Sequence, residues 1–370
     1  MNAGVKVLPT PLQQVDRTCV LLRGRKLSYF GGCDYFRLAS HPAVLHAVRD
    51  ALDQFGLNVA ASRKTTGNHR LYEELEGKLA RFFKAERAAF VSNGYLTNLV
   101  VAQALAGQFT HALVDARAHA SLRDAAELLG CPVIPFAHRD AADGARRLNR
   151  LGKSSRPLLL TDGMFAHDGS LAPLAAYLKL LPRHGRLLVD DAHGAGVLGE
   201  QGGGTVEMEG LDRERVIQTV TLSKAFGVYG GAVLASREVC GRIAERSRIF
   251  TGNTPLPLPL VNAAMRALKV FQSDRVMRRR LARNTKHVKY ALRATGLPLA
   301  DTPSPIIAVT PRDVRHARRL HQSLLAAGIY PNYIQYPGGP GSGYFRFALS
   351  SEHTPAQLGQ LVKVLSEFGR

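Results

Sequence analysis

The fold of this chain is decided by residues 216–233, VIQTVTLSKAFGVYGGAV. The segment begins with a short apolar run, the pattern of a buried strand, which delivers Thr221, Ser223 and Lys224 into a glycine-rich loop. Small hydroxyl residues and glycines around a lysine indicate a backbone that approaches a bound group closely. Schiff-base chemistry requires such an amine, partly desolvated so that its pKa falls. We therefore expect Lys224 to be a reactive amine, with the hydroxyls and loop amides beside it placed to hold a phosphate.

The segments that flank this loop alternate between strand and helix patterns. Short apolar runs such as AAFVS, HALVD and PLLLTDG are each followed by residues with helical spacing. This alternation predicts an α/β fold with a mostly parallel central sheet and helices on both faces. Further helices are expected after His41-Pro42 up to Gly56, and over residues 71–83 and 275–293. Chemistry in such sheets gathers at the carboxyl ends of the strands, so the polar residues after each run are the candidates.

The length of 370 residues exceeds that of a usual single domain. Beyond the proline cluster at residues 254–259 the pattern changes to long helices and then short strands. We therefore expect an N-terminal segment over residues 1–45, a large α/β domain over 46–260, and a small α+β C-terminal domain over 261–370.

A second candidate segment is RLLVDDAHGAG, which places Asp190 and His193 just past a predicted buried strand. The glycines that follow match the dinucleotide fingerprint GxGxxG literally. The sequence EQGGG then stands where that fingerprint requires a helix, so a Rossmann site is disfavoured. Taken alone, the segment also fits a tight glycine turn with a capping aspartate.

Together the two segments have the parts that a pyridoxal phosphate (PLP) site needs. A carboxylate at the pyridine nitrogen keeps that nitrogen protonated and makes the ring an electron sink, and Asp190 is the natural candidate. His193 is placed to reach the phenolic oxygen of the ring. His119, just after the strand that ends at Asp115, is a candidate to stack on the ring, although alone it fits an ordinary loop histidine. The turn at Gly94-Tyr95 begins a predicted helix and offers an anion site.

The order of the motifs resembles that of the α-oxoamine synthase family, PLP enzymes of fold type I. The resemblance runs from about Ser28 to Thr354 and rests on seven ordered motifs: VSNGYLTN, DARAHAS, TDGMFAHDGSLAPL, VDDAHGAGVLGEQGGG, TLSKAFGVYGG, IFTGNTPLPLP and FRFALSSEHT. It implies the fold-type-I PLP transferase (aspartate aminotransferase-like) fold and homodimers with shared active sites.

The resemblance also implies roles for single residues. Lys224 matches the Schiff-base lysine, Asp190 the partner of the pyridine nitrogen, His193 the histidine at the phenolic oxygen and His119 the stacking histidine. Gly94 and Tyr95 match the turn on the phosphate side, and Thr221 matches the phosphate-binding threonine, with the candidate Ser223 beside it. Thr251 matches a residue that reaches the phosphate of the neighbouring subunit. Arg346 matches the arginine that binds the substrate carboxylate.

The implied reaction is a decarboxylative Claisen-type condensation of an amino acid with an acyl thioester, carried by CoA or a carrier protein, to give an α-oxoamine. The alternatives are another PLP reaction on the same fold, such as transamination or lysis, or a non-catalytic protein that binds anions or nucleic acid. Two positions depart from the family: Cys33 stands where an asparagine is usual, and Ala166 where a serine is usual. We interpret these departures as an unusual substrate or an altered reaction.

The charge and the cysteine content indicate which partners, metal sites and cellular compartment the sequence fits. The net charge is +20, and residues 275–293 carry eight Lys or Arg and no acidic residue. This basic helix fits a solvated face or attraction to an anionic substrate such as a CoA thioester. No nucleic-acid-binding motif accompanies the charge, so nucleic acid is disfavoured. The four scattered cysteines predict neither a metal site nor disulfides, and no signal peptide or membrane span is recognised, so we expect a cytoplasmic protein.

Overall fold

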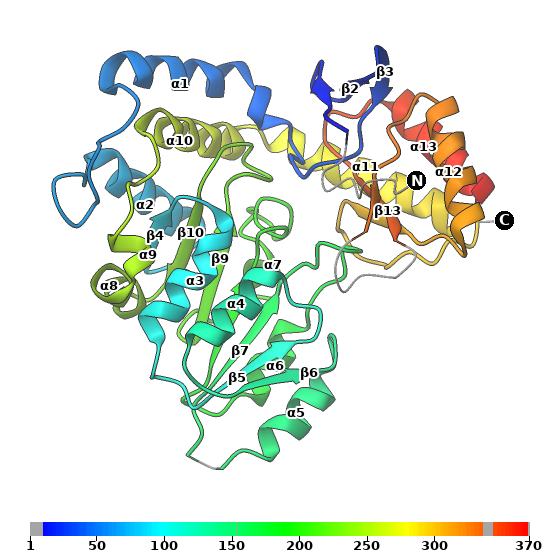
Figure 1. The fold of residues 1–370 in the computed structure, drawn as a ribbon. Coiled ribbons are helices and arrows are strands. Elements are labelled where there is room, and N and C mark those ends of the chain that lie inside the picture. The colour runs from blue at the N-terminus through cyan, green and yellow to red at the C-terminus, as the bar shows by residue number, and fades with distance from the viewer. Residues whose placement is uncertain (1–9, 153, 336–342, 369–370) are drawn as a thin grey trace, which may run out of the picture.

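The computed structural model describes residues 10–152, 154–335 and 343–368. Its centre is a seven-stranded sheet (Figure 1), whose strands in chain order are β4 (Arg87–Val91), β5 (His111–Asp115), β6 (Val133–Phe136), β7 (Pro157–Asp162), β8 (Arg186–Asp190), β9 (Val216–Thr221) and β10 (Gly231–Ala235). In space they follow the order β4-β10-β9-β8-β7-β5-β6. Strands β9, β8, β7, β5 and β6 run parallel, and β10 pairs antiparallel with both β9 and β4. The predicted α/β fold with a mostly parallel sheet is confirmed.

Helices cover both faces of this sheet (Figure 1). In chain order the helices of this part of the chain are α1 (Pro42–Phe55), α2 (Arg70–Phe82), α3 (Gly94–Leu105), α4 (Ala120–Leu128), α5 (Ala141–Asn149), α6 (Leu174–Leu180), α7 (Thr205–Met208), α8 (Arg237–Arg246), α9 (Arg248–Thr251) and α10 (Leu258–Ser273). Helix α1 packs on α10 rather than on the sheet (Figure 1). Alternate residues of one strand face opposite layers: Leu158 and Leu160 of β7 pack with α3, α4 and α8, whereas Leu159 packs with α6. Strands buried on both faces read as continuous apolar runs, which is why the sequence revealed them.

The strand register brings the carboxyl ends of neighbouring strands together. Asp162, the last residue of β7, is paired with Asp190, the last residue of β8, and Asp190 is paired with Thr219 of β9. Polar side chains that are far apart in the chain therefore meet at one edge of the sheet.

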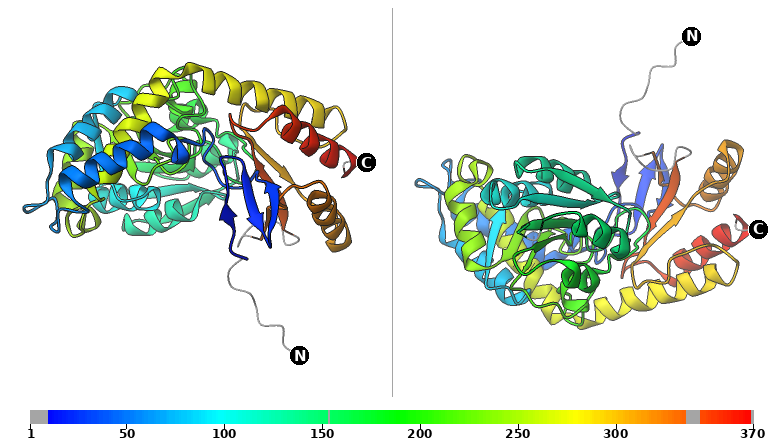
Figure 2. Two further views of the ribbon diagram at one scale, coloured as in Figure 1. Left: turned by 90° about the horizontal axis from the view of Figure 1, so that it is seen from above. Right: turned by 90° about the horizontal axis from the view of Figure 1, so that it is seen from below.

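The C-terminal part forms a second lobe beside the large sheet (Figure 2). It contains a three-stranded sheet in the order β11-β13-β12, and its elements are α11 (Arg275–Arg293), β11 (Ile306–Val309), α12 (Val314–Ala326), β12 (Tyr333–Ile334), β13 (Tyr344–Ala348) and α13 (Pro355–Phe368). The long helix α11 has the predicted bounds. In the sequence, Val276, Leu281, Val288 and Leu292 recur at roughly helical spacing, which predicts that all four lie on one buried stripe. This prediction is wrong for Val276, which is 49% exposed, and Met277 takes its place on the buried stripe with Leu281 and Val288.

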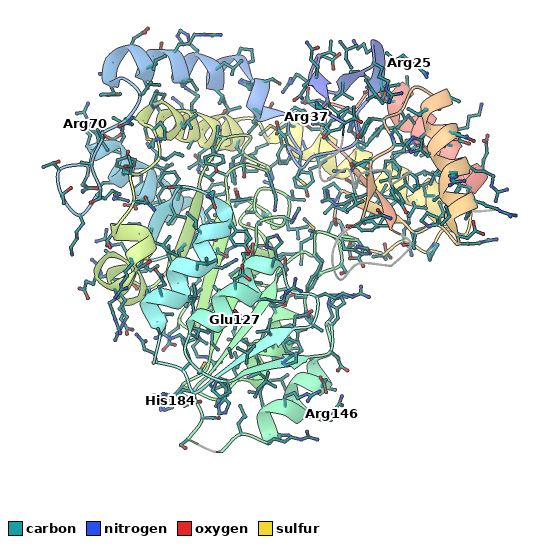
Figure 3. All side chains as sticks on the ribbon, viewed as in Figure 1. Arg25, Arg37, Arg70, Glu127, Arg146 and His184 are labelled. Carbon is teal, nitrogen blue, oxygen red and sulfur yellow. The ribbon has the colours of Figure 1, made fainter. Side chains whose placement is uncertain are left out.

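Within the N-terminal segment expected over residues 1–45, the chain forms a small sheet of β1 (Gln13–Gln14), β2 (Cys19–Leu22) and β3 (Arg25–Ser28). The turn between β2 and β3 has positive φ at Arg23 (50°) and Gly24 (77°), the geometry that joins a tight hairpin. Ser28 N donates to Gly328 O of the C-terminal lobe over 2.7 Å. Arg37, labelled in Figure 3, lies where helix α1 approaches this N-terminal sheet, and its Nη2 donates to the Tyr29 carbonyl.

The division into residues 1–45, 46–260 and 261–370 stays a prediction. Helix α10 crosses the boundary at residue 261, and its buried face packs in one core with α1 and α2. Within the residues that the structure describes, none of the helices combines the length and apolarity that crossing a membrane requires.

Candidate active site

Lys224 lies in the loop that connects β9 to β10, at the carboxyl edge of the sheet. Its side chain is half-buried. Burial lowers the pKa of the Lys224 amine, and the negative charges of Cys33 and Asp190 oppose that shift. A lysine with a lowered pKa supplies the neutral amine that attacks a carbonyl carbon. The lowered pKa is what a reactive amine at position 224 requires, and its Schiff-base role stays a prediction.

Asp190 is held in place by a buried asparagine that the sequence analysis did not single out. Asn98 of helix α3 is fully buried, and its Nδ2 donates to Asp190 Oδ2 over 2.7 Å. Its Oδ1 accepts from the Thr219 hydroxyl (2.7 Å), which fixes the orientation of the amide. The N–H of Ala192 donates to the second carboxylate oxygen of Asp190. Asp190 is thus a fixed, hydrogen-bonded carboxylate at the strand end.

His119 belongs to the same network. Its Nδ1 lies 2.8 Å from the hydroxyl of Ser121, which in turn accepts from Asn98 Nδ2 over 2.9 Å. The backbone N–H of His119 donates to Asp162 Oδ2 (2.9 Å). Burial and the nearby Asp190 charge raise the pKa of Asp162 well above its usual range. The His119 residue is exposed, and its ring lies edge-on to the Tyr95 ring. Its stacking role stays a prediction.

His193 is buried three residues after Asp190. Its Nδ1 lies 2.8 Å from the hydroxyl of Tyr35, a fully buried residue from the N-terminal part of the chain. Burial and the positive charges of Lys224 and Arg346 lower the pKa of His193 well below its usual range. His193 is therefore neutral at physiological pH, and Tyr35 sets which ring nitrogen carries the proton.

The glycine at position 94 is required by a close approach between the start of helix α3 and the end of strand β9. A Cβ built there would lie 2.8 Å from the Thr221 Oγ1 and 2.7 Å from the Thr221 Cβ. The Thr221 Oγ1 is also 2.7 Å from the Ser223 Oγ. The first N–H groups of helix α3, which have no intrahelical acceptor, thus begin beside two hydroxyls. Phosphate groups bind at such helix starts.

Tyr95, predicted with Gly94 on the phosphate side, is partly turned outward. It is 42% exposed, and its hydroxyl donates to the Asp124 carboxylate. Its ring contact with His119 keeps it at the rim of the site. Thr251 lies elsewhere, at the end of α9, with its hydroxyl bonded to the carbonyl of Ser247. Its expected role toward a neighbouring subunit stays a prediction.

Arg346 comes from the middle of β13 in the second lobe and is 7% exposed. Its Nε donates to the Ala166 carbonyl over 2.6 Å, and its Nη2 lies 3.4 Å from the Cys33 sulfur. Burial alone would raise the pKa of the Cys33 thiol, but the charges of Arg346 and Lys224 outweigh it and lower that pKa. Both positions that depart from the family thus contact one guanidinium.

These residues fit PLP by the chemistry of their side chains. A lysine with a lowered pKa, a clamped carboxylate and a neutral buried histidine share one edge of the sheet, and the Gly94–Thr221 contact leaves no room for a Cβ. They match the aldehyde, the pyridine nitrogen and the phenolic oxygen of the cofactor. Within the described residues, no cluster of His, Cys, Asp or Glu suits a metal ion.

Comparisons with known proteins agree with this site. The family described as "Aminotransferase class I and II" matches residues 31–365. The 8-amino-7-oxononanoate synthase of Thioalkalivibrio sulfidiphilus is 38% identical over 364 residues, which cover 98% of this chain and 91% of that protein. The corresponding enzyme of Trichlorobacter lovleyi is 34% identical, over 97% of this chain and 93% of the relative. Among solved structures, the serine palmitoyltransferase of Sphingomonas wittichii superposes with a TM-score of 0.90 at 30% identity, over 97% of this chain and 91% of that one.

Fold, site and comparisons together define a PLP-dependent enzyme of fold type I. The chain belongs to the α-oxoamine synthase family. The resemblance recognised in the seven motifs is thereby confirmed, and so are the predicted fold class and cofactor.

Asn98 was missed because polar residues inside an apolar helix have many structural uses. Asn98 lies four residues after Gly94, which places it about one helical turn along the same face of the helix. This spacing is the feature of the sequence from which Asn98 could have been predicted. Ser121 and Asp162 were missed because only the tertiary structure connects them to Asp190. Ser121 is linked to it through Asn98, and Asp162 through the pairing of β7 with β8.

We expect Asn98→Ala to weaken PLP binding and slow α-proton exchange by about 10-fold or more, because a hydrogen bond to a charged group is worth roughly 1.5–3 kcal/mol. The PLP dissociation constant and the exchange of the substrate α-proton with deuterium measure the effect. Asn284→Ala is the matched control, since Asn284 is also buried but bonds to the Ser350 carbonyl in the second lobe. Equal losses in both variants would contradict the positioning role of Asn98.

Cys33 is expected to be the first cysteine alkylated by iodoacetamide near pH 7. A lowered pKa leaves more thiolate at that pH, whereas burial raises the pKa of Cys19 and Cys131, and that of Cys240 to about 12. Peptide mass spectrometry across a pH series gives the midpoint for each thiol in one sample. Arg346→Gln should move the midpoint of Cys33 to higher pH. Labelling of Cys33 no faster than of the other three would refute the assignment.

Proposed function

We propose that this protein catalyses the decarboxylative condensation of an amino acid with an acyl thioester to give an α-oxoamine. The observation that carries the proposal is the buried Arg346, which stands beside the Lys224–Asp190 site in a chain whose relatives are named 8-amino-7-oxononanoate synthase. A guanidinium beside a reactive amine is suited to hold the carboxylate of an amino acid.

When bound, PLP supplies an electron sink for the carbanion at the α-carbon. Lys224 would hold the cofactor through its aldehyde, and its lowered pKa suits a neutral amine that would accept the α-proton. Asp190, fixed by Asn98, would keep the pyridine nitrogen protonated. His193 would donate a hydrogen bond to the phenolic oxygen through the ring nitrogen that Tyr35 does not contact. His119 would pack against the ring.

Substrate choice depends on the residues that contact Arg346. Cys33 and the Ala166 carbonyl both contact Arg346, so they set where its guanidinium points. The thiol of Cys33 is a polarisable neighbour of Arg346 and has a lowered pKa. The amide of an asparagine at this position would instead bind the substrate carboxylate directly. We propose that the preferred amino acid differs from that of relatives with an asparagine at this position.

We propose further that the enzyme works as a homodimer in the cytoplasm. Apolar side chains stand exposed along the outer side of α1 and just after it, at Leu45, Leu52 and Leu57, and again at Tyr229 beside the Lys224 loop. Exposed apolar residues of this kind suit coverage by a second copy. Thr251, whose position does not join the site of its own chain, is the candidate contribution to the partner's phosphate site. The four cysteines, all unpaired, suit a reducing compartment.

Transamination on the same fold remains the second candidate, because the matching family profile is that of the class I and II aminotransferases. The experiment that separates the two functions monitors free thiol from acyl-CoA thioesters and acyl-carrier thioesters in the presence of each standard amino acid. Condensation predicts thiol release and carbon dioxide only when both substrates are present.

Lys224→Ala is the matched control for that assay. It should abolish thiol release and the borohydride-stable attachment of PLP, while the fold is retained. Thiol release absent across the panel, with α-proton exchange intact in the unchanged enzyme, would favour transamination and refute condensation.

Arg346→Ala should raise the KM of the amino acid about 100-fold or more, since two hydrogen bonds to a carboxylate are lost, each worth roughly 1.5–3 kcal/mol. Spectral titrations with amino acid and with PLP measure the two affinities separately. Arg215→Ala, which removes a half-buried arginine bonded to carbonyls near α6, controls for general destabilisation. An unchanged amino-acid affinity in Arg346→Ala would exclude it as the carboxylate ligand.

A further inference from the structure

A basic hollow lies where helix α10 passes into α11, on the side of α2. Four cations line it, namely Arg81, Lys84, Arg275 and Arg278, and Phe82 and Phe271 form its apolar floor. Its volume is about 270 Å³, and no carboxylate is among its lining residues. The four positive charges of this hollow converge on one small space, in contrast to those of a flat basic face.

The four cations are not neutralised by ion pairs. None of them takes part in the salt bridges formed within the described residues. Asp274, next to Arg275, is occupied as the N-cap of α11 and accepts from the N–H groups of Val276 and Met277. The carboxylate of Glu207 is likewise turned to the N–H groups of Gln201 and Gly203.

Arg278 is rigidly positioned between this hollow and the next. Its Nη1 and Nη2 donate to the carbonyls of Glu200 and Gly199, each over 2.7 Å. Its guanidinium also lies over the Phe271 ring, 5.6 Å from the centroid. Its Nε is buried and has no hydrogen-bond acceptor within the described part of the chain. An arginine fixed in this way loses little side-chain entropy when it binds an anion.

A larger hollow adjoins the basic one and shares Gln201, Arg275 and Arg278 with it. Its volume is about 460 Å³, within the range of small-molecule sites. It differs from the basic hollow in its walls, which are partly apolar and are supplied by Phe36, Val197, Leu281 and Pro303. One carboxylate, that of Glu200, and the additional cation Arg279 also line it.

We propose that the two hollows form one site for a nucleotide, with the phosphates in the basic hollow and the nucleoside in the larger one. Unpaired cations suit the phosphates, and the apolar walls suit a purine or pyrimidine base. Lys224, Asp190 and Arg346 line neither hollow, so the site is separate from the active site. The proposal does not depend on the condensation activity.

Isothermal titration of the PLP-loaded protein with ATP, inorganic pyrophosphate and adenosine tests the site. ATP should bind more tightly than either fragment, because only ATP fills both hollows. The double variant Arg81→Ala/Arg275→Ala should weaken ATP binding about 10-fold or more, since two exposed cations next to the phosphates are lost.

The matched control is Arg318→Ala/Arg319→Ala, which removes the same charge from the exposed side of α12. It should leave ATP binding unchanged. Absence of ATP binding, equal loss in both double variants, or adenosine binding as tight as that of ATP would overturn the proposal. Tighter binding of a single-stranded oligonucleotide than of ATP would also overturn it, in favour of a nucleic-acid surface.

The source of the nucleotide can be separated in the same variants. If the ligand of the site is a free nucleotide, the double variant Arg81→Ala/Arg275→Ala should have an unchanged KM for acyl-CoA. If the site binds the nucleotide part of CoA, the same variant should have a raised KM for acyl-CoA. The visible absorption of bound PLP, unchanged in both double variants, shows that the active site is intact.

Discussion

The structure depends on one electrostatic arrangement, in which a lysine amine and a carboxylate are held at the same edge of a parallel sheet. Lys224 leaves β9 and Asp190 ends β8, so strand pairing alone brings their backbones together. The carboxylate is then oriented by Asn98, which is itself fixed by the Thr219 hydroxyl. Charges buried in this way are costly unless they are paired and hydrogen-bonded. The apolar helices on both faces provide the rigidity that keeps this geometry.

The second lobe contributes Arg346 to the site, although this residue lies more than a hundred positions after Lys224 in the sequence. Arg346 reaches from β13 to the Ala166 carbonyl and to the Cys33 sulfur, so three separate parts of the chain meet at one guanidinium. Tyr35, two residues after Cys33, contacts His193. The N-terminal part, the large sheet and the second lobe thus meet around Arg346 and His193.

Sequence patterns predicted the elements whose burial follows a simple period. The bounds of α11 were predicted correctly because its charges and apolar residues alternate at helical spacing. The placement of Val276 on its buried stripe was wrong, because the rotation of the first helical turn depends on what the helix packs against. The hairpin of β2 and β3 was not predicted, since such short strands stand out only by the turn that joins them.

The sequence by itself determined the sheet and the candidate lysine and carboxylate at its edge, because buried strands and a glycine-rich loop leave a local pattern. Only the tertiary structure decided which residues support them. Asn98, Ser121 and Tyr35 act through contacts with residues 23 to 158 positions away. The pairing of Cys33 with Arg346, and the cations gathered between α2 and α11, likewise exist only in the folded chain. Such contacts have no sequence period, because they arise from strand order and packing between layers.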